Sequence, residues 1–457
     1  MRYGKEDIFN MTLKVGIVSL GCAKNLVDTE VMLGCLKRAG FLITNREADA
    51  EILVVNTCGF ITDAKEESIN TILEMAQMKV TGCCRALLVA GCLAQRYAYE
   101  LMEEMPEIDG ILGVSSVLQI VSIINRVLAG ERVLEVGAPQ YTFGEMPRVL
   151  ATPPYTAYVK IAEGCDNKCT YCAIPSIRGS FLSRNMKSIE KETVDLVAEG
   201  VKEVILIAQD TTKYGFDIYG KFCLSNLIRE LVSINGLEWI RLLYCYPNKF
   251  TPELIEVLAS EKKVCRYLDI PLQHASDSVL LSMNRGGTTE QNKQLIELLR
   301  QAVPGIALRT SFIVGFPGET EDDFQTLLDF MQEVRFDRVG IFTYSLEEAT
   351  PAAALANQIP EDIKQDRYQK AMQLQQKISL ENNRRKTGSI ISVLIEGKAE
   401  DKKENNIYTY TGRSEFDAPG IDGKVFVKSP EELFTGEIVP VLIKRAYEYD
   451  LIGELSR

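Results

Sequence analysis

The chain has 457 residues, of which 25% are charged and 46% are hydrophobic, and its formal net charge is −12. This length and composition are typical of a globular protein with two or three domains. The negative charge excludes a general electrostatic attraction to nucleic acid or to an anionic membrane, although a local basic patch is compatible with it.

Two further features bear on location and chemistry. Apolar runs such as residues 86–90 are too short to cross a bilayer, and residues 1–10 lack the apolar core of a secretion signal. We therefore expect a cytosolic protein with no membrane partner. Twelve cysteines in a reducing compartment do not indicate a disulfide framework. With a single histidine, His274, thiolate-bound iron is the metal chemistry that remains.

Residues 13–140 alternate strand and helix patterns and are expected to form an α/β domain with a parallel sheet. Apolar strands are predicted at 13–20, 52–56 and 86–90, with helices at 25–39 and from residue 63. Each strand runs into a cysteine: Cys22, Cys58 or Cys92, which we call the N-terminal triad. The carboxyl ends of parallel strands lie on one side of a sheet, so these cysteines are predicted neighbours. Three buried structural cysteines are the alternative, but the repetition at three successive strand ends favours metal ligands.

A proline-bearing link at residues 151–154 closes this domain, and a strand at 158–162 then leads into EGCDNKCTYCAIPSIRGS. Here Cys165, Cys169 and Cys172, the central triad, have the spacing that wraps one face of a cubic iron–sulfur cluster. The run offers no fourth cysteine, so one iron would keep an open position, as in sites built for chemistry. A structural zinc site is the alternative, but it needs a fourth ligand that the local sequence does not supply. The remaining six cysteines are taken as structural or incidental: Cys35, Cys83, Cys84, Cys223, Cys245 and Cys265.

Residues 151–385 are expected to form a partial (βα)6 barrel with its chemistry at the carboxyl ends of the strands. Helices are predicted at 188–199 and 320–333, and five strands follow the first one: 204–208, 239–244, 267–270, 308–314 and 339–344.

A polar helix at 361–386 precedes the last predicted domain, residues 386–457, which reads as a small antiparallel β-barrel. Its apolar stretches are predicted at 390–395, 424–427 and 437–444. The domain carries 10 Lys and Arg against 13 Asp and Glu and is therefore net acidic.

The central triad resembles the signature of the radical S-adenosylmethionine enzymes. The resemblance implies that the open iron binds the methionine moiety of S-adenosylmethionine, and that Tyr171 lies near the adenine. Further predicted cofactor contacts follow from position near strand ends: Gln209 after the second barrel strand, Gly315 after the fifth, and Arg309 within the fifth. Gln209 or the adjacent Asp210 could equally cap the next helix, and Arg309 could pair with an acid. His274 is interpreted as a structural residue rather than a base, and no catalytic residue is assigned.

Three domains in this order resemble the methylthiotransferase family over nearly the whole chain, from SLGCAKN at residues 19–25 to a terminal barrel similar to a TRAM domain. The resemblance implies two 4Fe-4S clusters, with the N-terminal triad holding an auxiliary cluster that supplies sulfur. It also implies two S-adenosylmethionine molecules per turnover, one for methyl transfer and one for radical generation.

Within that family, the runs GCAKNLVDTEVMLG, CDNKCTYCAIPSIRGSFLSR, QDTTKYG and RSEFDAPGIDG resemble the RimO branch. This branch methylthiolates the β-carbon of an aspartate in ribosomal small-subunit protein twelve, free or on the ribosome, with an unidentified electron donor. The alternative is the MiaB branch, which modifies isopentenyladenosine in tRNA. A barrel that grips tRNA should be basic, since phosphate contacts supply most of the affinity; this one is acidic. A non-catalytic iron–sulfur or RNA-binding module is the rival from another class.

Overall fold

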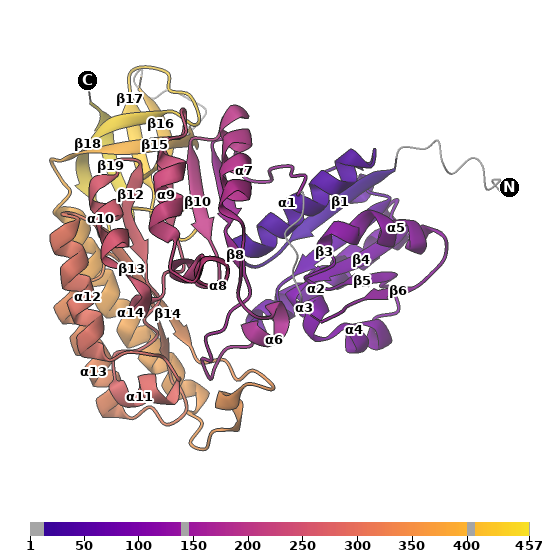
Figure 1. Ribbon diagram of the computed structural model, residues 1–457, viewed down its shortest axis with the longest axis horizontal. Coiled ribbons are helices and arrows are strands. Elements are labelled where there is room, and N and C mark those ends of the chain that lie inside the picture. Colours follow the sequence, from indigo (N-terminus) through magenta and orange to yellow (C-terminus); the bar gives the residue numbers. More distant parts are fainter. Residues whose placement is uncertain (1–12, 139–145, 400–406, 457) are drawn as a thin grey trace. The chain divides into compact units, whose positions relative to one another are not determined.

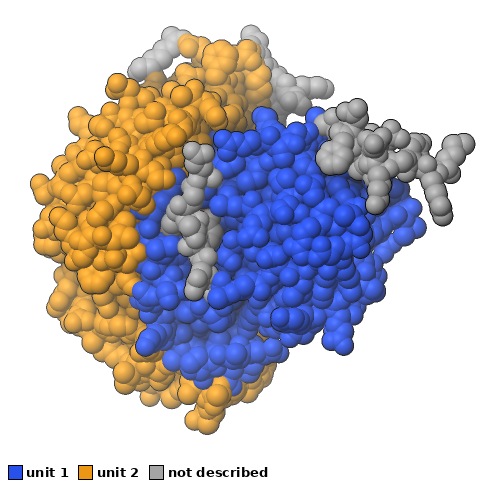
Figure 2. All heavy atoms as spheres, turned by 45° about the vertical axis from the view of Figure 1, so that its right-hand side comes forward, with its two compact units in different colours: residues 1–152, 163–184, 345–353 blue, residues 153–162, 185–344, 354–457 orange. Residues whose placement is uncertain are grey.

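The computed structural model describes residues 13–138, 146–399 and 407–456. It divides into two compact units, each built from several stretches of chain (Figure 2). Unit 1 comprises residues 1–152, 163–184 and 345–353, and unit 2 comprises residues 153–162, 185–344 and 354–457. This division groups residues that lie together in space, so it does not follow the order of the chain. In particular, the stretch that bears the central triad belongs to unit 1.

Unit 1 contains a six-stranded sheet in the order β2-β1-β3-β4-β5-β6, with every neighbouring pair parallel (Figure 1). This confirms the predicted parallel α/β fold. Its strands are β1 (Lys14–Ser19), β2 (Leu42–Ile43), β3 (Ile52–Thr57), β4 (Ala86–Gly91), β5 (Gly110–Leu112) and β6 (Val133–Glu135). Its main helices are α1 (Ala23–Arg38), α2 (Thr62–Thr81), α3 (Cys92–Arg96), α4 (Ala98–Glu104) and α5 (Ile120–Leu128).

The sheet is buried on both faces, which explains why its central strands are continuous apolar runs. On one face, Ile52, Val54 and Leu88 pack with residues of α1 and α5. On the other face, Leu53 and Val55 pack with residues of α2, α3 and α4. Successive residues of a strand point to opposite faces, so one strand contributes to both cores.

Two later stretches of the chain complete unit 1. Residues 163–184 include α6 (Ile174–Arg178) and β9 (Leu182–Ser183), which pairs with β8 (Ala162–Glu163). Residues 345–353 are held by Glu347, whose carboxylate is 2.9 Å from Lys65 Nζ on α2 and 2.7 Å from Arg96 Nη1 on α3. Glu347 is only 2% exposed, and its pKa is lowered because hydrogen bonds from its neighbours, with Lys65 foremost, outweigh the cost of burial.

Unit 2 contains a second parallel sheet, in the order β14-β13-β12-β11-β10-β7, flanked by helices (Figure 1). All six strands predicted for a partial barrel are present: β7 (Thr156–Lys160), β10 (Glu203–Ile207), β11 (Trp239–Leu242), β12 (Val264–Asp269), β13 (Ala307–Val314) and β14 (Arg338–Thr343). The helices are α7 (Met186–Ala198), α8 (Phe216–Tyr219), α9 (Leu224–Val232), α10 (Pro252–Ser260), α11 (Asp277–Ser282), α12 (Thr289–Ala302), α13 (Glu321–Val334) and α14 (Glu361–Arg384).

The last part of unit 2 is a closed five-stranded barrel, as predicted, in the order β15-β16-β17-β19-β18. Its strands are β15 (Ile390–Lys398), β16 (Tyr408–Ser414), β17 (Val425–Ser429), β18 (Ile438–Ala446) and β19 (Leu451–Leu455). The barrel is not wholly antiparallel, because β17 and β19 pair in parallel. This parallel pair closes the barrel between strands that are not consecutive in the chain.

Buried ion pairs attach this barrel to the amino-terminal ends of the central strands. Glu203, the first residue of β10, lies 2.8 Å from Arg241 Nε of β11 and also pairs with Arg413 of β16. Arg338, the first residue of β14, lies 2.6 Å from Asp417. Burial alone would raise the pKa of Glu203, but the two arginines lower it to about 2.

The described parts of the chain contain no helix of the length and apolarity that a membrane span requires.

Candidate iron–sulfur centres

The N-terminal triad follows three adjacent strands that end level with one another. In the register of the sheet, Ser19 of β1 is opposite Asn56 of β3, and Asn56 is opposite Ala90 of β4. Cys22, at the start of α1, and Cys92, the first residue of α3, lie just beyond two of these ends. Cys58 directly follows β3. Because the strands share this register, the three cysteines come together at the carboxyl ends of β1, β3 and β4, as their recurrence in the sequence predicts.

A glycine stands next to each cysteine of this triad, and each allows two loops to approach closely. A Cβ at Gly21 would lie 2.7 Å from Cys58 Cβ, and a Cβ at Gly59 would lie 2.8 Å from the backbone nitrogen of Leu93. Gly91 adopts a φ of +93°, and its Cβ would lie 2.4 Å from Asn56 Oδ1. At these three positions the backbone segments are in close contact, and a side chain larger than glycine would force them apart.

Asn25, in the first turns of α1, connects the same three loops with one amide. Its Nδ2 donates to the carbonyl oxygens of Leu20 (3.1 Å) and Thr57 (2.8 Å), just before Cys58. Its Oδ1 lies 3.6 Å from Cys92 Sγ. Asn25 is fully buried, so these contacts fix the loops without competition from water.

Arg178, at the end of α6, is a second connection, between α1 and the stretch that holds the central triad. Its Nη2 donates to Asn25 Oδ1 at 2.5 Å and to Asp28 Oδ2 at 3.0 Å. Its Nη1 donates to Glu163 Oε2 at 3.0 Å. The three charged side chains are 1% to 3% exposed. Burial disfavours the charged guanidinium, but Cys92, Glu163, Asp28 and Cys22 together raise its pKa well above the usual value.

The thiols of the N-terminal triad differ in acidity. Burial raises the pKa of Cys58 to about 11 and also raises that of Cys92, although the charge of Arg178 opposes the second shift. For Cys22, burial is outweighed by the charges of Lys24 and Arg178 and by backbone hydrogen bonds, so its pKa is lowered. Cys22 influences the ionisation of both Cys58 and Cys92, and Cys92 influences that of Cys58, which agrees with their proximity.

The central triad lies in a loop closed by backbone hydrogen bonds. The Cys165 amide donates to Gly179 O at 3.0 Å, and the Cys172 amide donates to Cys169 O at 3.1 Å. Asp166 Oδ1 accepts from the backbone amide of Phe181 at 2.9 Å. Cys165 and Cys169 are buried, whereas Cys172 is partly exposed. The loop therefore folds back on itself with its three sulfurs in a largely enclosed position.

The two triads belong to the same unit. Ala173, directly after Cys172, and Ile177 of α6 form a buried apolar cluster with Cys92 and Val114. The helix that follows the central triad therefore packs against Cys92 of the N-terminal triad. Together with Arg178, this contact makes one continuous block of the two cysteine regions.

The donor sets fit iron–sulfur clusters better than a single metal ion. Within the described residues, no three His, Cys, Asp or Glu side chains are grouped closely enough to hold one ion. In a cubic cluster each thiolate binds a different iron, so its three cysteines stand further apart than the ligands of one ion. Soft thiolates are also the usual ligand set of such clusters.

The other predicted cofactor residues have varied surroundings. Tyr171 lies in the turn between Cys169 and Cys172, and Gln209 follows β10 with partial exposure. Asp210 caps a short 3-10 helix by accepting from the Lys213 amide at 3.2 Å, which is the alternative considered for it.

Arg309 and Gly315 of the same prediction already have close neighbours. Arg309 is 2.9 Å from Asp269 and 3.5 Å from Asp422. A Cβ at Gly315 would lie 2.3 Å from Lys364 Cγ, so the close approach at this glycine is made by a lysine side chain.

His274 is buried and neutral. Its Nδ1 accepts from the Ser276 amide at 2.9 Å, and its Nε2 lies 3.8 Å from Glu319 Oε2, which is too long for a hydrogen bond. Burial lowers the pKa of His274 to about 3 and raises that of Glu319 to about 7. The geometry agrees with the structural interpretation of His274.

Sequence reasoning did not single out Asn25, Asp28, Glu163 or Arg178. One signal was present in the sequence: α1 carries polar residues three and four positions apart directly after Cys22. Such spacing puts Asn25, Asp28 and Thr29 on one helical face, and the structure buries all three. A polar face that is buried beside a ligand indicates support for the site rather than a solvated surface.

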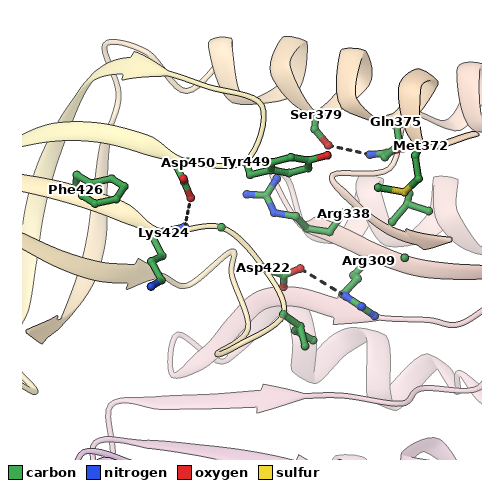
Figure 3. Close-up of a pocket in the computed structure, with 14 residues that line it drawn as sticks. Arg309, Arg338, Met372, Gln375, Ser379, Asp422, Lys424, Phe426, Tyr449 and Asp450 are labelled. Atoms are coloured by element: carbon green, nitrogen blue, oxygen red, sulfur yellow. Dashed lines mark hydrogen bonds and ion pairs between the residues drawn. The ribbon is translucent and has the colours of Figure 1, made fainter. Parts of the chain in front are cut away.

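Unit 2 has a separate cavity of about 470 Å³ between β13, β14, α14 and the C-terminal barrel (Figure 3). Arg309, Arg338 and Lys424 line it together with Asp422 and Asp450. Its charges are largely paired, and none of its lining residues is a cysteine. It is therefore distinct from the cysteine site.

Comparison with known families divides the chain into three matched regions. Residues 14–113 match Uncharacterized protein family UPF0004, residues 159–331 match the Radical SAM superfamily, and residues 387–455 match the TRAM domain. Among solved structures, the radical S-adenosylmethionine methyltransferase TsrM from Kitasatospora setae is similar in fold, with a TM-score of 0.54 and 16% sequence identity. The match covers 75% of this chain and 74% of that one.

Curated relatives are similar over almost the whole length. The chain is 58% identical over 445 residues to the ribosomal protein uS12 methylthiotransferase RimO of Pelotomaculum thermopropionicum, covering 97% of this chain and 99% of that protein. The proteins of the same name from Heliobacterium modesticaldum and Desulforamulus reducens are 57% and 56% identical. They are covered over 95% and 99% of their lengths, again with 97% of this chain.

Proposed function

This chain belongs to the RimO family of ribosomal protein uS12 methylthiotransferases, and we propose that it inserts a methylthio group at the β-carbon of an aspartate of that protein. It is a radical S-adenosylmethionine enzyme. The observation that supports the proposal most directly is that both cysteine triads lie in one compact unit. A reaction that opens a C–H bond and adds sulfur to the same carbon requires its two reagents to be close together.

In this proposal the central triad (Cys165, Cys169, Cys172) binds the 4Fe-4S cluster that takes S-adenosylmethionine, and the N-terminal triad (Cys22, Cys58, Cys92) binds the auxiliary 4Fe-4S cluster. When bound, these groups supply the electron, the hydrogen-abstracting chemistry and the sulfur that the side chains lack. Three of the six thiols, those of Cys92, Cys165 and Cys169, are buried, which limits the access of water to these sulfurs.

Tyr171, Gln209, Arg309 and Gly315 remain predicted contacts of S-adenosylmethionine. In the structure Arg309 pairs with acids and Lys364 fills the space beside Gly315, so contact at these two positions requires their neighbours to move. Tyr171 lies between two of the proposed ligands, Cys169 and Cys172. Two S-adenosylmethionine molecules are used in each turnover, one as methyl donor.

The proposed partner is ribosomal protein uS12, free or on the ribosome, and the proposed location is therefore the cytoplasm. The acidic balance of residues 386–457 supports a basic protein segment as the substrate rather than tRNA. An electron donor is also required, because the reaction begins with reduction of a cluster.

Incubation with two substrates tests the proposal. Anaerobically reconstituted enzyme is given S-adenosylmethionine, a reductant and either uS12 or tRNA that contains isopentenyladenosine, and each product is examined by mass spectrometry. We expect a methylthio mass gain on one aspartate of uS12 and none on the tRNA. A gain on the tRNA alone would refute the protein substrate. Clusters without production of 5′-deoxyadenosine would indicate a non-catalytic module.

A further inference from the structure

Arg178 is a fully buried cation beside the N-terminal triad, although it comes from the stretch that follows the central triad. It has a single positive charge, yet it faces two carboxylates, Asp28 and Glu163, within 3.1 Å. A buried charge is costly unless it is paired and fully hydrogen-bonded. Here both terminal nitrogens of the guanidinium have partners of opposite charge or polarity.

The partners of Arg178 are themselves positioned by the cysteine loops. Asn25, which accepts from Arg178, donates to the Thr57 carbonyl just before Cys58 and lies against the Cys92 sulfur. Glu163 stands two residues before Cys165, and its Oε1 also accepts from the Gly164 amide at 3.3 Å. One guanidinium thus connects structure next to Cys58, Cys92 and Cys165.

Electrostatics adds to this geometry. Arg178 Nη2 lies 2.5 Å from Asn25 Oδ1, and Cys92 Sγ lies 3.6 Å from the same oxygen, so the cation is close to this sulfur. The carboxylate of Asp28, 3.0 Å from the same nitrogen, brings a charge of opposite sign to the same place. Hydrogen bonds to sulfur and net charge near a cluster are established determinants of its reduction potential. Removing the cation and removing the anion should therefore have opposite effects on a cluster at this triad.

We propose that Arg178 is a positioning residue of the auxiliary centre: its guanidinium holds Asn25, Asp28 and Glu163 in place and stabilises negative charge at the sulfur of Cys92. This inference rests on the proposed function, because it takes the N-terminal triad as the ligands of a cluster. It goes further because it assigns to one side chain both the hydrogen bonds that connect the two cysteine regions and the positive charge between them.

The test uses the full chain with Cys165, Cys169 and Cys172 replaced by alanine, so that only the auxiliary cluster is observed. R178M, R178K and D28N are made in this background, and the midpoint potential is measured by EPR-monitored titration together with iron and sulfide content. R126M is the matched control, because Arg126 also pairs with two carboxylates in unit 1 but is 40% exposed.

At a fixed poise, we expect R178M to lower the ratio of reduced to oxidised cluster at least tenfold. D28N should raise this ratio, and R126M should leave it unchanged. R178K keeps the charge but not the planar fork, so it should recover most of the potential while binding less iron.

Shifts of R178M and D28N in the same direction, or no shift in either, would overturn the proposal. If R178M retains no iron, D28N decides, since an unchanged potential overturns the proposal and a rise supports it. Wild-type turnover on uS12 is measured in parallel. Opposite shifts without turnover would count against the proposed function and not against the role of Arg178.

Discussion

Replacing Gly91 with alanine tests whether the close approach of the cysteine loops is essential. Gly91 has φ +93° and ψ −157°, a backbone region that is nearly exclusive to glycine. A side chain there costs about 1–3 kcal/mol in backbone strain. The added Cβ would also lie 2.4 Å from both Asn56 Oδ1 and Thr57 O, and overpacking of this kind costs about another 1–3 kcal/mol.

The expected loss for G91A is therefore roughly 2–6 kcal/mol, a large part of the 5–15 kcal/mol typical of a native domain. We would measure it in the apoprotein by native-state hydrogen exchange of the β3 and β4 amides, which reports on unit 1 specifically. The control is G130A, because Gly130 has a φ of +92° with nothing within 4 Å of its Cβ position. This control should lose only about 1–2 kcal/mol.

Equal losses in G91A and G130A would refute the reasoning, because they would show that the contact with β3 costs nothing. G91A should also bind less iron at the N-terminal triad, since Cys92 is the next residue. Normal iron content together with a large loss of stability would separate the fold of the sheet from the ligand geometry.

Three further outcomes are expected. Alanine at Cys22, Cys58 and Cys92 together should abolish methylthio gain on uS12 while 5′-deoxyadenosine is still formed; unchanged product yield and iron content would exclude the auxiliary site. E203Q should cost about 3–5 kcal/mol in thermal or urea unfolding, because it removes the buried carboxylate charge that Arg241 and Arg413 share. The folded pKa of Glu203 (about 2) is below its unfolded value of 4.5, so its contribution exists above pH 4.5 and is lost as the pH falls toward 2. The pKa of His274 is lowered to about 3 from 6.5, so the wild type should lose about 1.4 kcal/mol per pH unit on acidification through this range, and H274N should not. Parallel stability–pH curves for H274N and the wild type would contradict this assignment.

The strands predicted from the sequence are those that form continuous apolar runs, because such a run indicates a buried strand without knowledge of its neighbours. The run from Ile52 to Thr57 is apolar enough to be identified without knowledge of its neighbours, and all six central strands were found for similar reasons. The missed strands are short or polar. β5 and β6 have three residues each, and β16 reads YTYTGRS, so each depends on pairing with strands distant in the sequence.

The six cysteines were predicted as ligands from recurrence and spacing, and the structure places each triad within unit 1. The supporting residues were not predicted, because a buried charge becomes favourable only through a partner far along the chain. Arg178 and Asp28 are 150 positions apart, and neither indicates the other in the sequence. The same holds for Glu203 and Arg413, which are separated by 210 positions.

The buried ion pairs between the C-terminal barrel and the amino-terminal ends of the central strands affect how substrate binding can be studied. Truncation near residue 386 would remove Arg413 from Glu203 and Asp417 from Arg338. It would also remove the Glu415 carbonyl that accepts from Arg241. If a shortened enzyme no longer modified uS12, the loss could come from destabilisation of the central sheet, so it would say little about where the substrate binds. Charge reversal at exposed barrel positions such as Lys444 and Glu454 leaves those ion pairs intact and therefore tests directly whether the barrel takes part in binding uS12.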